Sequence, residues 1–587
     1  MEAAANRQHN YICRLYNMEV PRILPLFLLL LVFSLAESGL KEEEVDKTLR
    51  AVLACNKNPG MAVSVVKDGR IVFSKGYGVK NRETKEPVSN KTLFGIASLS
   101  KAFASTLLVK LLHRTKEITL DTEISKIYNN DNIFSDDLRS RYVTIRDLLA
   151  HNIGIRSNNY MRFDDTLTRG NIYRRLKYLR GRGRFRESFY YSNLMYGVIT
   201  DIAERLGKKS WEDLVREELL NPIGMTSTTF ATVAEEKEID LATGYIDFYG
   251  DIHPVSFKLS KEWGNLCGSG CVMSSANDMA KWMMFHLDKG RNSFSVRVVD
   301  ERALSHTHKA HNTIAKSSIF KYFTKPVVPH THCQTNYALG WKNGYYRGYE
   351  ILTHSGSTWG YRALITLFPA MRLGVYTSLT GEDYGYILRT NIHNYLADMY
   401  LEETPWLNGS TICSFPEPWF RPGKEKPKPL IDKTRALPRN TTYYVGEYEN
   451  PAYGRMIVAV NGTTGKLIIK YGVVTLGLYP KAMKDEFHFE TLGFAAFVLN
   501  FGTIKFKMET LSGYFAAFQV TTFDTKDPPE FQRFMAQNDL PEVGNTLYVA
   551  SNPNGASTLH FGNLLYGILI IWIINLFTSR KISSCQS

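Results

Sequence analysis

Ser98 and Lys101 lie three residues apart in the stretch FGIASLSKAF, residues 94–103, which otherwise has the apolar character of a buried helix start. This spacing puts the hydroxyl and the amine on one helical face. A serine hydroxyl is a poor nucleophile until a base takes its proton, and a lysine can be that base when burial or neighbouring positive charge keeps it partly neutral. The alternative is that Ser98 caps the helix and Lys101 reaches for solvent. Because S-x-x-K occurs by chance in many proteins, the pair needs partners elsewhere in the chain.

The first candidate partner is the triplet Tyr191-Ser192-Asn193, which stands in front of an apolar helix. A phenol held near a lysine can lose its proton and act as a general base. The Asn193 amide can orient both the lysine and a substrate carbonyl. The alternative is that Tyr191 belongs to the core and that Asn193 caps the helix, a position that asparagine favours.

The second candidate is His354-Ser355-Gly356, in LTHSGSTWGY on an expected inner strand. Gly356 would let a substrate approach the backbone closely. The Ser357 N–H would then join the Ser98 N–H, at a helix N-terminus, as a donor to an oxyanion. The alternative is a glycine-rich strand end with an incidental histidine.

Taken in order, these motifs resemble the serine β-lactamases and penicillin-binding proteins, in the class C-like branch, which use S-x-x-K, then Y-x-N or S-x-N, then K-T-G or H-x-G. Three further segments are similar to that family: VTIRDLLAHNIGI, LLNPIGMTSTTF and GSGCVMSSANDMAKW. The resemblance covers about residues 43 to 400. VGEYENPAYGRMIVAV, after residue 440, also looks like the small β domain appended to some members.

The resemblance implies acyl transfer without a cofactor or a metal. Ser98 would attack a carbonyl, Lys101 and Tyr191 would share the proton transfers, and Asn193 would position the substrate. The antibiotic-destroying members carry a lysine where His354 stands, and a histidine supplies that charge only in part near neutral pH. The resemblance therefore implies a peptidase or esterase rather than a true β-lactamase. The alternative is a non-catalytic extracellular binding or matrix protein on the same scaffold.

The elements that must position these residues alternate between helix and strand over residues 43–402. We expect an α/β (α+β) fold of the β-lactamase and transpeptidase type, with an antiparallel sheet flanked by helices. GMAVSVVKDGRIVFSKGYG predicts a hairpin around Lys67-Asp68-Gly69, and residues 354–381 predict another that turns near Pro369. Residues 403–440 are proline-rich and indicate a linker. Residues 441–535 contain short strands and predict a small β barrel or sandwich.

The two ends of the chain predict processing and membrane attachment. Residues 23–36 form an apolar run after Arg22, which indicates a signal peptide over residues 1–38, with an N-terminal anchor as the alternative. Residues 561–577 contain no charge and are followed by Arg580 and Lys581, as in a transmembrane helix whose body lies outside the cell. A secreted form is the alternative.

Sequons and cysteines agree with an extracellular body. Predicted N-glycosylation sites are Asn90, Asn408, Asn440 and Asn461. Apart from Cys13 and Cys585, which lie in the terminal segments, the chain has an odd number of cysteines: Cys55, Cys267, Cys271, Cys333 and Cys413. One or two disulfides are expected, and the sequence does not show which cysteines pair.

The remaining features concern partners. The net charge is +14, but no nucleic-acid-binding module is present, so we expect a small-molecule or peptide substrate and no nucleic acid. The basic run Arg174–Arg186 is either a solvated loop or a rim that binds an anionic partner. The histidine-rich stretches SHTHKAH and HTHC, residues 305–311 and 330–333, fit no known zinc spacing, and no metal is expected.

Overall fold

The computed structural model describes residues 39–115, 117–314, 323, 327–421, 431–498, 502–510 and 513–534. The predicted signal peptide and the predicted transmembrane helix at 561–577 lie outside these residues. Within the described ranges, no helix has both the length and the apolar character needed to cross a membrane.

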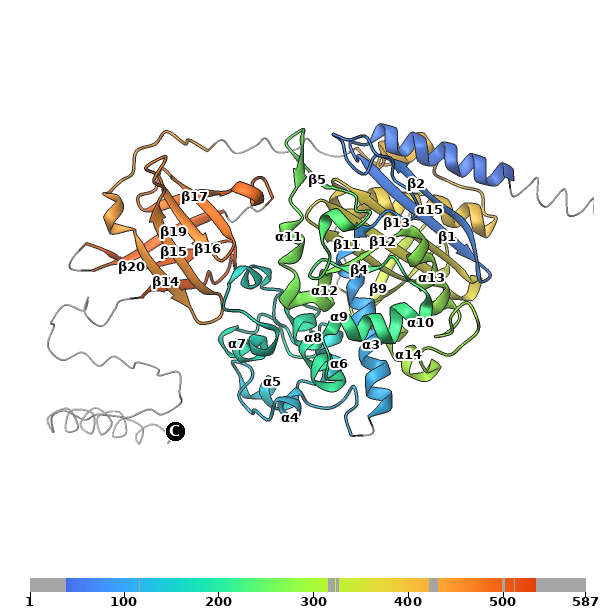
Figure 1. Cartoon of the computed structure of the whole chain (residues 1–587), viewed down its shortest axis with the longest axis horizontal. Helices are drawn as coiled ribbons and strands as arrows, with labels where there is room; N and C mark the ends of the chain where they lie inside the picture. Colours follow the sequence, from blue (N-terminus) through green and yellow to red (C-terminus); the bar gives the residue numbers. More distant parts are fainter. Residues whose placement is uncertain are drawn as a thin grey trace, which may run out of the picture. The chain divides into compact units, whose positions relative to one another are not determined.

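An antiparallel sheet forms the centre of the first domain (Figure 1), with eight strands in the described part of the chain and the order β2-β1-β13-β12-β11-β10-β9-β8. Both predicted hairpins are confirmed. The turn from β1 to β2 uses Asp68 and Gly69 at φ of 50° and 76°, the backbone that a tight hairpin turn requires. The strands are β1 (Gly60–Lys67), β2 (Arg70–Gly78), β8 (Asn312–Thr313), β9 (His332–Tyr337), β10 (Lys342–Tyr346), β11 (Tyr349–Thr358), β12 (Tyr361–Phe368) and β13 (Leu373–Thr380).

Helices cover both faces of this sheet, which is why β1 is buried along almost its whole length. Met61 and Val63 on one face pack with the helix over residues 39–55 and with α15 (Ile387–Leu401). Ala62 on the other face belongs to the larger core. That core is built by α3 (Ser100–Arg114), α6 (Ile145–Leu149), α8 (Asn193–Gly207), α9 (Trp211–Val215), α12 (Cys267–Gly270), α13 (Ala276–Leu287) and α14 (Glu301–His308).

Shorter helices and strands lie between these elements. The helices are α4 (Ile124–Tyr128), α5 (Asp137–Tyr142), α7 (Ile172–Arg175), α10 (Asn221–Ile223), α11 (Lys258–Lys261) and α16 (Gly409–Ser414). The strands are β3 (Phe94–Gly95), β4 (Thr229–Phe230), β5 (Gly244–Phe248), β6 (Asp251–Val255) and β7 (Val272–Ser274).

The second domain is a closed antiparallel barrel (Figure 1). The prediction of short strands is confirmed, and of the two predicted architectures the structure shows the barrel. Glycines let its turns approach the first domain closely: a Cβ on Gly472 would collide with the Phe163 carbonyl oxygen. Tyr453 also donates a hydrogen bond to Asn158 Oδ1 at 2.7 Å. The strands are β14 (Gly446–Asn450), β15 (Gly454–Val460), β16 (Leu467–Tyr471), β17 (Val474–Pro480), β18 (Glu486–Leu492), β19 (Thr503–Glu509), β20 (Phe515–Val520) and β21 (Glu530–Arg533).

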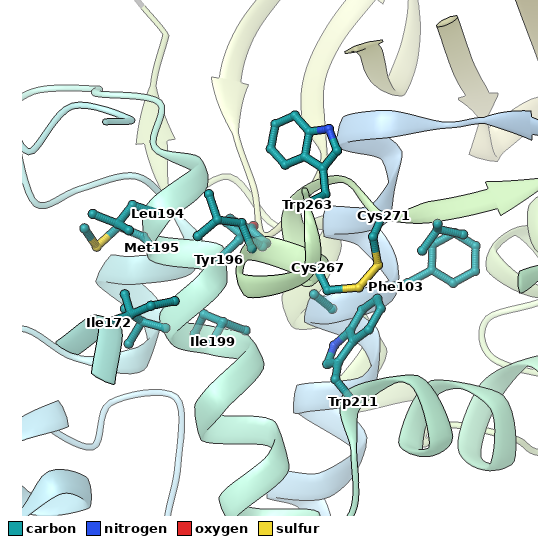
Figure 2. Close-up of a cluster of buried hydrophobic side chains, with 14 of the residues drawn as sticks. Phe103, Ile172, Leu194, Met195, Tyr196, Ile199, Trp211, Trp263, Cys267 and Cys271 are labelled. Atoms are coloured by element: carbon teal, nitrogen blue, oxygen red, sulfur yellow. A yellow bond between two sulfur atoms is a disulfide. The ribbon is translucent and has the colours of Figure 1, made fainter. Parts of the chain in front are cut away.

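The structure shows which cysteines pair, and it forms two disulfides among the described residues. Cys55–Cys413 joins the helix over residues 39–55 to α16, across 358 positions of sequence. Cys267–Cys271 closes a loop within the core (Figure 2), in the cluster that also contains Phe103 and Trp211. Cys333 is a free thiol.

Candidate active site

Ser98 lies in the short 3₁₀ turn η1 (Ala97–Leu99), between β3 and α3. The residue before it, Ala97, has φ of 48°, a left-handed conformation that costs free energy in a residue with a Cβ. Ser98 is partly exposed, whereas Lys101 on α3 is completely buried. The N-cap of α3 is Leu99, without a side-chain hydrogen bond. The alternative interpretation, in which Ser98 caps the helix and Lys101 reaches solvent, is therefore wrong.

The Lys101 amine has three oxygen neighbours, which match its bonding capacity. Nζ lies 3.2 Å from Ser98 Oγ, 2.6 Å from Asn193 Oδ1 and 3.0 Å from the Ser269 carbonyl oxygen. It also lies 4.6 Å from the centre of the Tyr191 ring. Burial, reinforced by the positive charge of Lys342, holds the pKa of Lys101 well below its usual range. The site thus favours a neutral amine beside the Ser98 hydroxyl.

Tyr191 is partly exposed, and its phenol lies close enough to the Ser98 hydroxyl to be influenced by it. Burial raises the pKa of Tyr191, although the Ser98 hydroxyl acts in the opposite direction. The phenol is therefore protonated in the resting site, and Lys101 is the group suited to be the base. The His151 ring lies 4.5 Å from the Tyr191 ring, and its Nδ1 accepts a hydrogen bond from the Ser192 N–H at 3.2 Å. This buried histidine holds the Y-x-N segment in place.

Asn193 is the first residue of α8, but its side chain does not cap that helix. Its oxygen accepts from Lys101, and its Nδ2 donates to Asn159 Oδ1 at 2.9 Å. Its backbone N–H donates to Ser157 Oγ at 2.8 Å. The amide is thus fixed from both sides with its oxygen toward the amine, which rejects the capping alternative.

The residues His354 to Thr358 occupy the end of β11 that extends past its neighbour β10. The pairing of the two strands ends at Lys342 opposite Thr353, so this end has an edge that β10 does not cover. Ser357 is exposed there. Such an edge can accept an extended substrate as an added strand, with the Ser357 N–H near the nucleophile segment.

His354 is only 2% exposed, and this burial favours its neutral form. Its Nδ1 lies 2.8 Å from the Ser355 carbonyl oxygen and must donate to it, so Nε2 accepts from the Tyr337 hydroxyl at 3.1 Å. Burial, and then the charges of Lys342 and Lys101, hold the pKa of His354 well below its usual range. The expectation that His354 supplies part of a positive charge is wrong, because burial removes that charge.

Gly356 has a packing role that the sequence did not predict. A Cβ at this position would collide with the carbonyl oxygen of Ile96, two residues before Ser98. The glycine is therefore required for β11 to pack against the nucleophile segment, and a role in the approach of a substrate stays a prediction.

Lys342 is the main site residue that the sequence analysis missed. It lies on β10 opposite Thr353, next to His354. Burial lowers the pKa of Lys342 to about 8, and it forms no ion pair with any described residue. The sequence could have indicated Lys342 only if the register of the hairpin from β10 to β11 had been known, because that register places Lys342 beside the H-x-G motif. Ser269 was also missed, because a carbonyl contact leaves no mark in the side-chain pattern.

The basic run Arg174–Arg186 is largely engaged in ion pairs. Arg182 pairs with Asp524 of the barrel domain at 2.8 Å, and Arg186 pairs with Asp147 at 2.8 Å. Arg175 pairs with the fully buried carboxylate of Asp164 at 2.6 Å. Part of the run thus joins the two domains, and a role in binding an anionic partner stays a prediction.

The structure also places the predicted sequons and the histidine stretches. Asn408 and Asn440 are exposed, and their Oδ1 atoms accept backbone hydrogen bonds, which leaves each Nδ2 available. Asn90 and Asn461 are partly exposed, and glycosylation stays a prediction for all four. His308 Nε2 lies 2.9 Å from His286 Nδ1. Glu212, Cys267 and Cys271 lie together, but the disulfide consumes both thiols.

The sheet, its covering helices and the Ser–Lys turn define a serine hydrolase fold. The chain belongs to the β-lactamase family, whose Beta-lactamase model matches residues 45–392. It is 39% identical to Gigasin-6 of Magallana gigas over 272 residues, which cover 46% of this chain and 90% of that protein. It is 27% identical to an unguisins hydrolase of Aspergillus campestris over 361 residues, 59% of this chain and 63% of that one.

Among solved structures, the octameric penicillin-binding protein homologue from Pyrococcus abyssi matches with a TM-score of 0.53 and 20% identity. The match covers 84% of this chain and 99% of that one, and at this identity it shows the fold alone. The predicted family and fold class are confirmed.

Proposed function

We propose that this protein is an extracellular serine hydrolase that cleaves a peptide, amide or ester bond through an acyl-enzyme on Ser98. The observation that carries the proposal is the Lys101 amine 3.2 Å from Ser98 Oγ, in surroundings that favour its neutral form. A neutral amine has two N–H donors and one lone pair. Asn193 Oδ1 and the Ser269 carbonyl oxygen accept the two donors, so the lone pair faces the Ser98 hydroxyl.

Acylation then follows from this arrangement. Ser98 Oγ bonds to the substrate carbonyl carbon as its proton passes to Lys101, and the carbonyl oxygen becomes an oxyanion. Backbone N–H groups of Ser98 and Ser357 hold the oxyanion, each donor contributing about 3 to 4 kcal/mol. The protonated Tyr191 phenol donates to the leaving nitrogen or oxygen as its bond to the carbonyl carbon breaks, and Tyr191 regains a proton from Lys101.

Deacylation reverses the proton transfers. Water attacks the acyl carbon, its proton passes to Lys101, and Ser98 Oγ leaves and is reprotonated. The product is a carboxylic acid. The neutral His354 supports a peptidase, amidase or esterase over an antibiotic-degrading β-lactamase, and the relative named as an unguisins hydrolase supports hydrolysis in general. Two disulfides support an oxidising, extracellular location.

The test is labelling of the purified full-length chain with a reactive fluorophosphonate, read by intact mass. We expect one label per chain, lost in Ser98→Ala and kept in Ser105→Ala, a control serine of α3 whose hydroxyl donates to the Ala102 carbonyl oxygen. A folded protein that takes up no label would instead favour the non-catalytic binding or matrix protein.

A further inference from the structure

Arg162 is a buried cation that the proposed reaction does not use. It lies in the 3₁₀ turn η2 (Asn159–Phe163) and is 6% exposed. Its guanidinium carbon lies 4.1 Å from the centre of the Trp263 ring and 4.3 Å from that of Trp359. Among the described residues, its Nε and Nη1 atoms have no hydrogen-bond partner.

This arrangement is costly, because a buried charge is normally paired and hydrogen-bonded. Arg389, which is completely buried, satisfies this rule through Asp383 at 2.6 Å. The indoles attract the Arg162 guanidinium over their faces but accept none of its in-plane donors. Glu262 is close enough to act on Arg162 electrostatically without an ion pair, and burial lowers the pKa of Arg162 to about 9, which leaves it protonated at neutral pH.

The turn η2 links Arg162 to the proposed catalytic residues. Residues i and i+3 of a 3₁₀ turn lie on the same face, so Arg162 shares a face with Asn159. Asn159 accepts the hydrogen bond from Asn193, and Asn193 in turn accepts from Lys101.

The indole that flanks Arg162 gives a second connection. Trp263 Nε1 donates to Thr358 Oγ1 at 2.9 Å, and Thr358 follows Ser357 on β11. Trp263 also packs against Gly270, the neighbour of Ser269 (Figure 2 shows Trp263 above the Cys267–Cys271 segment). Through Trp263, Arg162 is thus linked to the segment that contacts Lys101 and to the end of β11 that carries Ser357.

We propose that Arg162 is a substrate-binding residue that recognises a free carboxylate on the peptide, amide or ester substrate, an inference that rests on the proposed function. A guanidinium offers fixed in-plane donors to a flat carboxylate, and the bordering indoles favour a planar group. The neutral His354 cannot supply this charge. The substrates of this site are then acyl compounds with a carboxylate beyond the scissile bond or on the acyl part.

The experiment uses four matched dipeptides: the N-terminus carries acetyl or succinyl, and the C-terminus is a free acid or an amide, each made in the L and D series. The variants are Arg162→Gln, Arg162→Lys and the control Arg302→Gln, an exposed arginine of α14. We expect a carboxylate at one end to raise kcat/KM by roughly 10- to 100-fold, as for hydrogen bonds to charged groups. Arg162→Gln should remove this preference, Arg162→Lys should keep part of it, and Arg302→Gln should keep all of it.

Binding of the same dipeptides to the inactive variant Ser98→Ala, measured by calorimetry, tests the inference without requiring catalysis. Carboxylate-selective binding that disappears in Ser98→Ala/Arg162→Gln supports it, even if fluorophosphonate does not label wild-type Ser98 and the proposed function fails. Equal binding of acids and amides, no binding of any member, or selectivity that survives Arg162→Gln overturns it. A structural role predicts instead that Arg162→Gln lowers Tm and weakens acids and amides alike, which also overturns it.

Discussion

The Lys101 amine lies 2.6 Å from the side-chain oxygen of Asn193, and within the described ranges it has no carboxylate partner. An amide oxygen accepts a hydrogen bond without favouring the charged ammonium as strongly as a carboxylate would. The choice of Asn over Asp at this contact therefore keeps Lys101 available as a base.

Asn193→Asp tests this relationship. The added negative charge should favour the ammonium form and raise the pKa of Lys101, so the acidic limb of the kcat/KM profile should move to higher pH. At pH 7 the labelling rate should fall by about 100- to 10,000-fold, the contribution of a positioned base. Tm should stay or rise, because the buried amine gains an ion pair. A variant with a wild-type pH profile would show that Lys101 is not the base.

Lys342→Gln should move the pKa of Lys101 in the same direction, by removing a positive charge instead of adding a negative one. Its positive charge helps to lower the pKa of Lys101, so its removal should raise that pKa and move the acidic limb upward, with the nucleophile itself intact. Lys281→Gln is a matched control, since that lysine pairs with Asp278 on α13 at 3.1 Å. Labelling rates from pH 5 to 10 measure the effect, and coincident profiles for Lys342→Gln and wild type would remove Lys342 from the site.

A site residue could be predicted from the sequence where its role depends on its side-chain type and spacing. Ser98, Lys101, Tyr191 and Asn193 form a spaced pattern, and the structure brings them together as the sequence indicated. The charge state of His354 was not predictable, because it depends on complete burial beside two lysines. Lys342 lies beside His354 through a strand register, and Arg162 is linked to Asn193 only through the turn η2; side-chain periodicity reveals neither relationship. The fold was more accessible, since β1 and β2, and likewise β12 and β13, are apolar runs separated by recognisable turn residues.

Glu218 should give a pH-dependent part of stability near α3. It pairs with Lys110 at 2.9 Å and with Arg114 at 2.7 Å, and the hydrogen bond from Arg114 lowers the pKa of Glu218 to about 2. Because the folded pKa lies below the unfolded value, the stabilisation is present above about pH 4.5 and is lost as the pH falls toward 2. Glu218→Gln should cost about 1 to 2 kcal/mol at pH 7 and little at pH 2.5, measured by urea unfolding. Glu217→Gln, a half-exposed neighbour, should cost less at pH 7, and equal costs would contradict the assignment.

Gly356→Ala should uncouple activity from folding. The added methyl group would collide with the Ile96 carbonyl oxygen and push η1, with Ser98, away from β11. We expect a stability loss of about 1 to 3 kcal/mol, as for overpacking, and a loss of labelling of at least about 100-fold. Gly170→Ala is the matched control, because no atom lies within 4 Å of its added Cβ. If Gly356→Ala labels as fast as Gly170→Ala, the packing of β11 against η1 does not position the nucleophile.

The two disulfides should have separate effects. Cys267–Cys271 encloses Ser269, whose carbonyl oxygen accepts from Lys101 at 3.0 Å, but its short loop constrains the unfolded chain by only about 2 kcal/mol. The double variant Cys267→Ser/Cys271→Ser should therefore lower the labelling rate about tenfold with a small change in Tm. Cys55–Cys413 closes a loop of 358 positions and joins helices whose core cluster lies on the face of the sheet opposite to α3, so Cys55→Ser/Cys413→Ser should lose up to about 5 kcal/mol of stability and keep its labelling rate. Labelling rate and Tm measured on both variants give the comparison. The same effect on both quantities in the two variants would mean that the short disulfide has no particular role in holding the Ser269 carbonyl against the amine.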